Sequence, residues 1–205
     1  TQNKQGKQNE QQESESKPSL TKLCSTLQTL SHQIWENNTC KQVIQIPKLL
    51  QSLVALSRFK VGSHLREEID RQRLEVRSWS RRCLSWIQLN NDEQIQTELV
   101  NIEYERVMSI TFCTAGDLGE EQDEEIYNGL FYVFSFLNEL QRGKTYRQLS
   151  FQPLPLLVRR SEEQIEEEGA NEEIDAQMAN NGIYGHIKFN AKLAKAATLN
   201  YFIHR

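Results

Sequence analysis

Hydrophobic residues recur at helical spacing along most of the chain after residue 19, and no segment shows a convincing strand pattern. The first such series is made of five aliphatic residues spaced by three or four positions: Leu20, Leu23, Leu27, Leu30 and Ile34. This spacing places one narrow apolar stripe on a helix. The sequence therefore predicts a helix from residue 20 to the polar segment at 36–39.

The same periodicity predicts six further helices. They are expected over 43–60, 63–89, 92–113, 125–141, 161–180 and 183–203. Pro47 suits the first turn of the regular part of the second helix, and Asn91 or Asp92 is placed to cap the fourth. In the third helix, Trp79 and Trp86 share one arc with aliphatic residues, so we expect both indoles to be substantially buried.

Two segments interrupt the helical pattern. Residues 1–19 contain no large apolar side chain and are predicted to be a disordered tail or linker. At 150–160, Pro153 and Pro155 predict an extended connector because proline disrupts helix interiors. The predicted organisation is therefore a helical-hairpin array at 20–149, this connector, and a C-terminal helical pair at 161–205.

Composition agrees with an all-α protein. Nine Gly and four Pro in 205 residues are few for an all-β fold. The longest apolar run, 130–137, is far shorter than the roughly 20 residues of a membrane-spanning helix. The four cysteines form no C-x-x-C pair, which favours free thiols in a reducing compartment, cytoplasmic or nuclear.

The last segment carries a pattern of small residues. Asn181-Gly182 is followed by Lys188, Asn190, Ala191, Ala194, Ala197 and Leu199. This pattern, mainly within 161–203, resembles an armadillo/HEAT-type helical repeat. The resemblance implies an irregular α-solenoid of helical hairpins, here with about seven helices, that binds other proteins along an extended face.

An acidic segment lies within 161–182, where eight carboxylates fall between Glu162 and Asp175. Its spacing lacks the fixed loop positions and central glycine of an EF-hand. Several of these acids lie in the first turns of a predicted helix, where they favour the helix dipole. A solvated helix face is the favoured interpretation. An acidic docking surface for a basic partner and a cation site are the alternatives.

A second charged feature is an arginine stripe on the third predicted helix, formed by Arg66, Arg73, Arg77 and Arg81. Acidic residues interleave with it, and several oppositely charged pairs are spaced for contact along a helix. The stripe can form structural ion pairs, bind an acidic protein partner, or bind phosphates of nucleic acid. We predict that it meets carboxylates, from this chain or a partner, and we take its four arginines as the candidate partner-binding residues.

No catalytic, nucleotide-binding or metal-binding motif is present, and the four histidines are scattered. No cofactor is therefore expected. The sequence favours a non-enzymatic protein–protein interaction or scaffold module, a subunit of a larger complex whose partners carry acidic contact surfaces. A nucleic-acid-associated protein using the basic face of 58–82 is the alternative, and an enzyme without a recognisable motif is a third. A deep pocket lined by perturbed carboxylates would favour the enzyme.

Overall fold

The computed structural model describes residues 20–36, 42–43, 45–58, 67–90, 92–113, 122–144 and 150–200. Within these ranges the chain is α-helical, as predicted, and the extended backbone pairs only in one isolated antiparallel bridge between Lys144 and Phe151. No helix in these ranges combines the length and the apolar character needed to cross a membrane.

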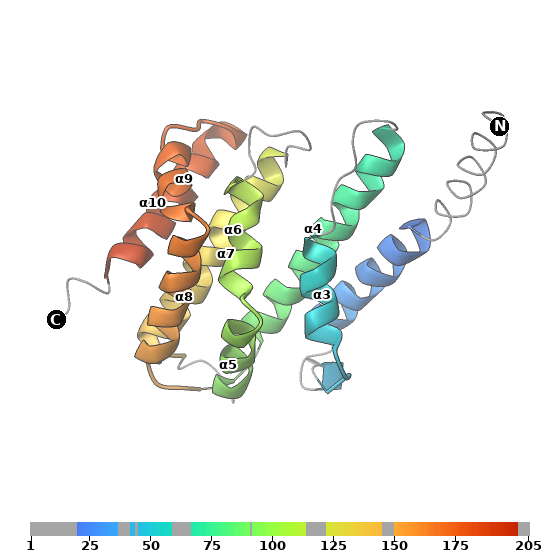
Figure 1. The fold of residues 1–205 in the computed structure, drawn as a ribbon, viewed down its shortest axis with the longest axis horizontal. Coiled ribbons are helices and arrows are strands. Elements are labelled where there is room, and N and C mark those ends of the chain that lie inside the picture. Colours follow the sequence, from blue (N-terminus) through green and yellow to red (C-terminus); the bar gives the residue numbers. More distant parts are fainter. Residues whose placement is uncertain are drawn as a thin grey trace, which may run out of the picture.

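The helices follow one another across the molecule in the order of the sequence (Figure 1). Helix 20–36 lies at one end, and α10 lies at the other. The elements that follow helix 20–36 are, in chain order, α3 (Leu49–Ser57), α4 (Glu67–Leu89), α5 (Glu93–Asn101), α6 (Tyr104–Cys113), α7 (Asp123–Arg142), α8 (Pro155–Glu167), α9 (Ala170–Gln177), the 3-10 helix η1 (Ile183–Gly185) and α10 (His186–Asn200).

The described residues contain more helices than the seven predicted because two expected helices are broken. The helix expected over 92–113 is divided into α5 and α6 at Glu103, whose φ of 61° cannot continue a right-handed helix. The helix expected over 161–180 is divided into α8 and α9 at Gly169, with φ 66°. The predicted cap at Asp92 is confirmed, since its side chain accepts a hydrogen bond from the Ile95 amide.

Two predicted helix starts are wrong. The second helix begins at Leu49 rather than near residue 43, because Lys48 adopts a left-handed conformation with φ 63° and Pro47 lies in the preceding turn. Helix α8 begins at Pro155, inside the segment expected to be extended. Proline is well suited to the first turn of a helix, where its missing N–H would have no partner.

Helix α7 lies at the centre of the C-terminal half and contacts α6, α8 and α10. Its approach to α6 depends on Gly129, because a Cβ at this position would lie 1.8 Å from Oγ1 of Thr111. On α10, Ala191 and Ala194 are fully buried, and their small side chains allow the close contact between α10 and α7. Most of the buried hydrophobic residues form one cluster, which includes residues from Cys24 to Ala197.

A group of polar side chains joins the C-terminal end of α4 to α5 and α7. Gln88 donates through Nε2 to Oε2 of Glu139 at 2.8 Å, and Gln96 donates through Nε2 to the Gln88 carbonyl at 3.0 Å. Lys144 donates to the Leu89 carbonyl. Burial raises the pKa of the Glu139 carboxyl, so the hydrogen bond from Gln88 holds a group that is costly to bury as an anion.

Candidate functional site

The arginine stripe lies largely inside the protein. Arg73 pairs with Asp70 at 3.5 Å, and Arg81 places Nη2 2.7 Å from Oε2 of Glu125 on α7. Arg77 and Arg81 are only 7% and 1% exposed, whereas Arg66 lies outside the described residues. The prediction that the stripe meets carboxylates is confirmed for Arg73 and Arg81, and both carboxylates belong to this chain. Burial leaves little of Arg77 or Arg81 for contact with another protein.

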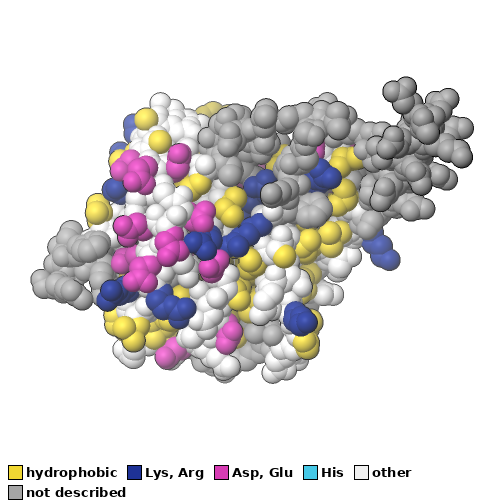
Figure 2. Space-filling model, in the orientation of Figure 1, with side chains coloured by type: hydrophobic (Ala, Val, Ile, Leu, Met, Phe, Trp, Pro, Cys, Tyr) yellow, Lys and Arg dark blue, Asp and Glu magenta, His cyan; other side chains and the backbone are white. Residues whose placement is uncertain are grey.

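The acidic segment forms an exposed surface over α8 and α9 (Figure 2). Several of its carboxylates pair with cations of this chain. Glu163 pairs with Arg159 at 3.1 Å, and Glu167 and Glu168 both pair with Arg106, at 2.7 and 2.6 Å. These contacts agree with a solvated helix face. In the described part of the chain, no group of three His, Cys, Asp or Glu side chains could hold a metal ion.

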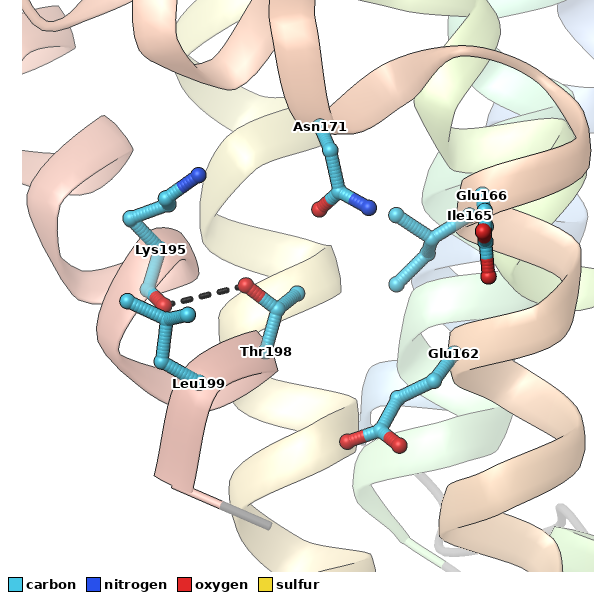
Figure 3. Close-up of a pocket in the computed structure, with 7 residues that line it drawn as sticks. All are labelled: Glu162, Ile165, Glu166, Asn171, Lys195, Thr198 and Leu199. Carbon is cyan, nitrogen blue, oxygen red and sulfur yellow. Dashed lines mark hydrogen bonds between the residues drawn. The ribbon is translucent and has the colours of Figure 1, made fainter. Parts of the chain in front are cut away.

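One member of the acidic segment differs from the rest. Glu162 lies beside a pocket of about 240 Å³ between α8, α9 and α10, and its carboxylate extends toward α10 (Figure 3). Three elements supply the lining, which consists of Glu162, Ile165 and Glu166 from α8, Asn171 from α9, and Lys195, Thr198 and Leu199 from α10. The pocket exists because Gly169 turns the chain between α8 and α9 and so places Asn171 opposite α10.

The polar groups of this pocket are engaged unequally. Lys195 pairs with Asp175 at 2.9 Å, and Thr198 donates to the Lys195 carbonyl at 2.9 Å. By contrast, Oε1 of Glu162 is shielded from solvent and accepts no hydrogen bond from the described residues. Burial raises the pKa of the Glu162 carboxyl to about 7. Lys195 and Thr198 are thus engaged in contacts within the chain, and the Glu162 carboxylate is the polar group of the lining that keeps a buried oxygen without a donor from the described residues.

A second surface feature joins helix 20–36 to α4. We call it the aromatic ridge, and it consists of Trp35, Trp79, Arg82 and Trp86. Trp35 is 58% exposed, and its ring centroid lies 4.3 Å from that of Trp86. Cζ of Arg82 lies 4.9 Å from the centroid of the Trp79 ring, a cation–π geometry. Trp79, Arg82 and Trp86 share a face because their spacing of three and four residues is helical.

The ridge adds a residue that the sequence pattern missed. Trp79 and Trp86, which were expected to be substantially buried, have intermediate exposure and pack against the hydrophobic core. Both lie beside aromatic side chains of helix 20–36, since His32 lies 6.4 Å from Trp79 by ring centroids. Trp35 directly follows Ile34, the last member of the predicted apolar stripe, and its position beyond the stripe is the only sequence signal of its exposure.

A buried carboxyl lies away from both features. Glu105 on α6 is fully buried, and neither of its carboxylate oxygens accepts a hydrogen bond from the described residues. Burial raises the pKa of this carboxyl well above its ordinary value, so the neutral acid is the form compatible with the folded chain. Glu105 does not line the pocket beside Glu162, and we treat it as a buried group whose protonation affects stability.

Comparison with known proteins gives no relative: no family model, curated protein or solved structure matches this chain. The resemblance of residues 161–203 to an armadillo/HEAT-type repeat therefore stays a prediction from the sequence.

Proposed function

We propose that this chain is a non-enzymatic protein–protein interaction module, a scaffold element of a larger assembly, and that the aromatic ridge is its contact surface. The observation that carries the proposal is the exposed indole of Trp35, which contacts the tilted ring of Trp86 at 4.3 Å between centroids. Tryptophan and arginine are the residue types most enriched among those that dominate binding energy at protein interfaces. A surface that combines three indoles with a guanidinium has the composition of such an interface.

The geometry of the ridge also lowers the entropic cost of binding. Contact with Trp86 holds the Trp35 ring, and contact with Trp79 holds the Arg82 guanidinium. Side chains that are already ordered lose less conformational freedom when a partner covers them. Both contacts therefore reduce the conformational entropy that the ridge loses when it binds a partner.

The cations of residues 58–82 favour a protein partner over nucleic acid. Arg71 pairs with Glu68 at 2.9 Å and with Glu75 at 2.5 Å, and Arg58 pairs with Glu103 at 3.1 Å. Arginines that already contact carboxylates of the same chain contribute less to phosphate binding, because each ion pair must first be broken. The basic face is thus a poor phosphate-binding surface.

An α-solenoid of the armadillo/HEAT kind is the architecture we propose for this function. Its support is the order of the helices in space, which follows their order in the sequence, together with the buried alanines of α10. Such arrays present long surfaces to their partners. The ridge, formed by two neighbouring helices, lies on a surface of this kind.

The test compares two chains that each lose one equally exposed aromatic side chain. Trp35→Ala removes the exposed part of the ridge, and Phe189→Ala removes a side chain of α10 that is also 58% exposed. Proteins that copurify with the wild type should be lost with Trp35→Ala and kept with Phe189→Ala, as measured by quantitative mass spectrometry. If both variants retain the same proteins, the ridge is not the contact surface.

A direct binding measurement separates the protein partner from nucleic acid. Single-stranded and duplex nucleic acid are titrated into the wild type and Trp35→Ala at about 0.15 M salt, where purely electrostatic binding is weak. We expect no saturable binding below the micromolar range. Submicromolar affinity that Trp35→Ala abolishes would make the ridge a base-stacking surface and would overturn the proposed function.

A further inference from the structure

We propose that the pocket between α8, α9 and α10 binds an alkylammonium group, and that Glu162 is the anion that receives it. The inference is independent of the aromatic ridge, which belongs to helix 20–36 and α4. The pocket, its lining and the carboxylate of Glu162 are seen in Figure 3.

The first argument is the missing hydrogen-bond donor. Oε1 of Glu162 is shielded from solvent without accepting a hydrogen bond from the described residues. Buried polar atoms are nearly always hydrogen-bonded, to protein, water or a ligand, because an unsatisfied one is costly. Glu162 lines the pocket, so a cation bound there would supply the partner that its carboxylate lacks among the described residues.

The second argument is the charge of the surroundings. Helix α8 brings Glu166 to the same pocket, and α9 brings the neutral Asn171. The cation of α10, Lys195, is paired with Asp175 of α9 at 2.9 Å. With two carboxylates in the lining and its one lysine already paired, the pocket favours a cation over an anion.

The third argument is the combination of apolar and polar lining. Ile165 and Leu199 provide aliphatic contact, whereas Glu162 provides the charge. An alkylammonium has the same two parts, a short hydrocarbon stem and a compact head with three donors. A hydrated metal ion would leave the aliphatic part of the lining unused.

The alkylammonium group could come from two sources, a free amine or the lysine side chain of another protein. The experiment uses four probes: n-butylammonium, n-butanol as its neutral counterpart, a lysine-containing peptide, and the same peptide with acetyl-lysine. Binding is followed by the NMR chemical shifts of residues lining the pocket. Butylammonium and the lysine peptide should shift them saturably, whereas butanol and the acetylated peptide should not.

Two substitutions test the role of Glu162. Glu162→Gln removes the charge from the pocket, while Glu163→Gln removes the neighbouring charge, which pairs with Arg159 outside the lining. Loss of a charge-assisted hydrogen bond should weaken butylammonium binding by at least about tenfold in Glu162→Gln. Affinity should be unchanged in Glu163→Gln. Thermal unfolding of both variants shows whether either change disturbs the fold.

The wild type supplies a measurement that needs no substitution. Because the pKa of the Glu162 carboxyl is about 7, its ionised fraction increases from pH 6 to pH 8, while the ammonium stays protonated. Affinity for butylammonium should therefore increase over this range. Equal binding of butanol, a pH-independent affinity, or unchanged binding by Glu162→Gln would each overturn the proposal. Peptide binding at least about tenfold tighter than that of butylammonium would assign the site to a protein lysine, and comparable affinities would assign it to a free amine.

Discussion

The two longest helices of the described residues, α4 and α7, are held in the molecule by different kinds of contact. Helix α7 buries a continuous set of apolar side chains, namely Leu130, Val133, Phe136, Leu137 and Leu140. Helix α4 buries polar side chains alongside its aliphatic ones, namely Arg77, Ser80, Arg81, Ser85 and Gln88. Each helix thus shows one way to fix a long helix within a helical array.

This difference determines which substitutions each helix tolerates without loss of stability. Apolar burial is roughly proportional to area, so α7 should lose stability according to the volume removed. Polar burial depends on matched partners, because a group left without its partner is costly even when little volume changes. On helix α4, Trp79 and Trp86 are only partly buried, which leaves some of its apolar surface available to other molecules.

The largest expected effect is the loss of Phe136 from α7. Phe136 is fully buried and its ring lies 4.7 Å from that of Tyr104, so Phe136→Ala should lower the free energy of unfolding by about 3–5 kcal/mol. Trp79→Ala on α4 removes a larger but only partly buried side chain and should cost about 1–3 kcal/mol. Urea denaturation measures both values. Equal losses would show that the two helices do not differ as described.

The next effect concerns the buried ion pair of α4. Arg81→Met should destabilise the chain by about 2–4 kcal/mol, because it leaves Glu125 in a largely buried position without its cation. Arg71→Met, on the exposed side of the same helix, is the matched control and should change stability much less.

A double-mutant cycle with Glu125→Gln isolates the pair itself. The cost of Arg81→Met should shrink once Glu125 is neutral, because no anion is then left unpaired. Additive effects of the two substitutions would show that Arg81 stabilises the chain without its ion pair to Glu125.

The periodicity of the sequence was enough to predict most helices but not the breaks between them. Glu103 ends α5 with a left-handed conformation, although glutamate has no preference for that region. The position of the break is imposed by packing of distant helices, which no local pattern records. Gly169 does carry a sequence signal for such a break, yet the strong pattern on both sides of it favours one continuous helix.

The pocket and the ridge depend on contacts between segments that are far apart in the sequence. In the sequence, Glu162 cannot be distinguished from the other seven acids of its segment. The fold distinguishes it by placing Lys195, Thr198 and Leu199 opposite it. The surface formed by Trp35 likewise depends on its contact with Trp86, which joins helix 20–36 to α4. The chemistry of these residues is visible in the sequence, but their neighbours are set by the packing of α10 and α4.

The smallest expected effect concerns Glu105 and depends on pH. The pKa of the Glu105 carboxyl is higher in the folded chain than in the unfolded chain. The contribution of Glu105 to stability is therefore fully present at a pH below its unfolded-state pKa. This contribution is lost as the pH rises through its folded-state pKa. Glu105→Gln removes this dependence and should stabilise the chain at neutral pH by about 1–3 kcal/mol. The gain, measured by thermal or urea unfolding, should be smallest near pH 4–5 and increase toward pH 8. A gain that is independent of pH would contradict a neutral Glu105.

The bridge between Lys144 and Phe151 brings two points of the chain together after α7. Each residue donates its amide to the carbonyl of the other, at 2.8 and 3.0 Å. A reporter domain inserted between these two residues would enter and leave the protein at neighbouring points. Because the entropic cost of a longer connection grows by only about 0.6 kcal/mol for each doubling of its length, this position is suited to building fusion proteins.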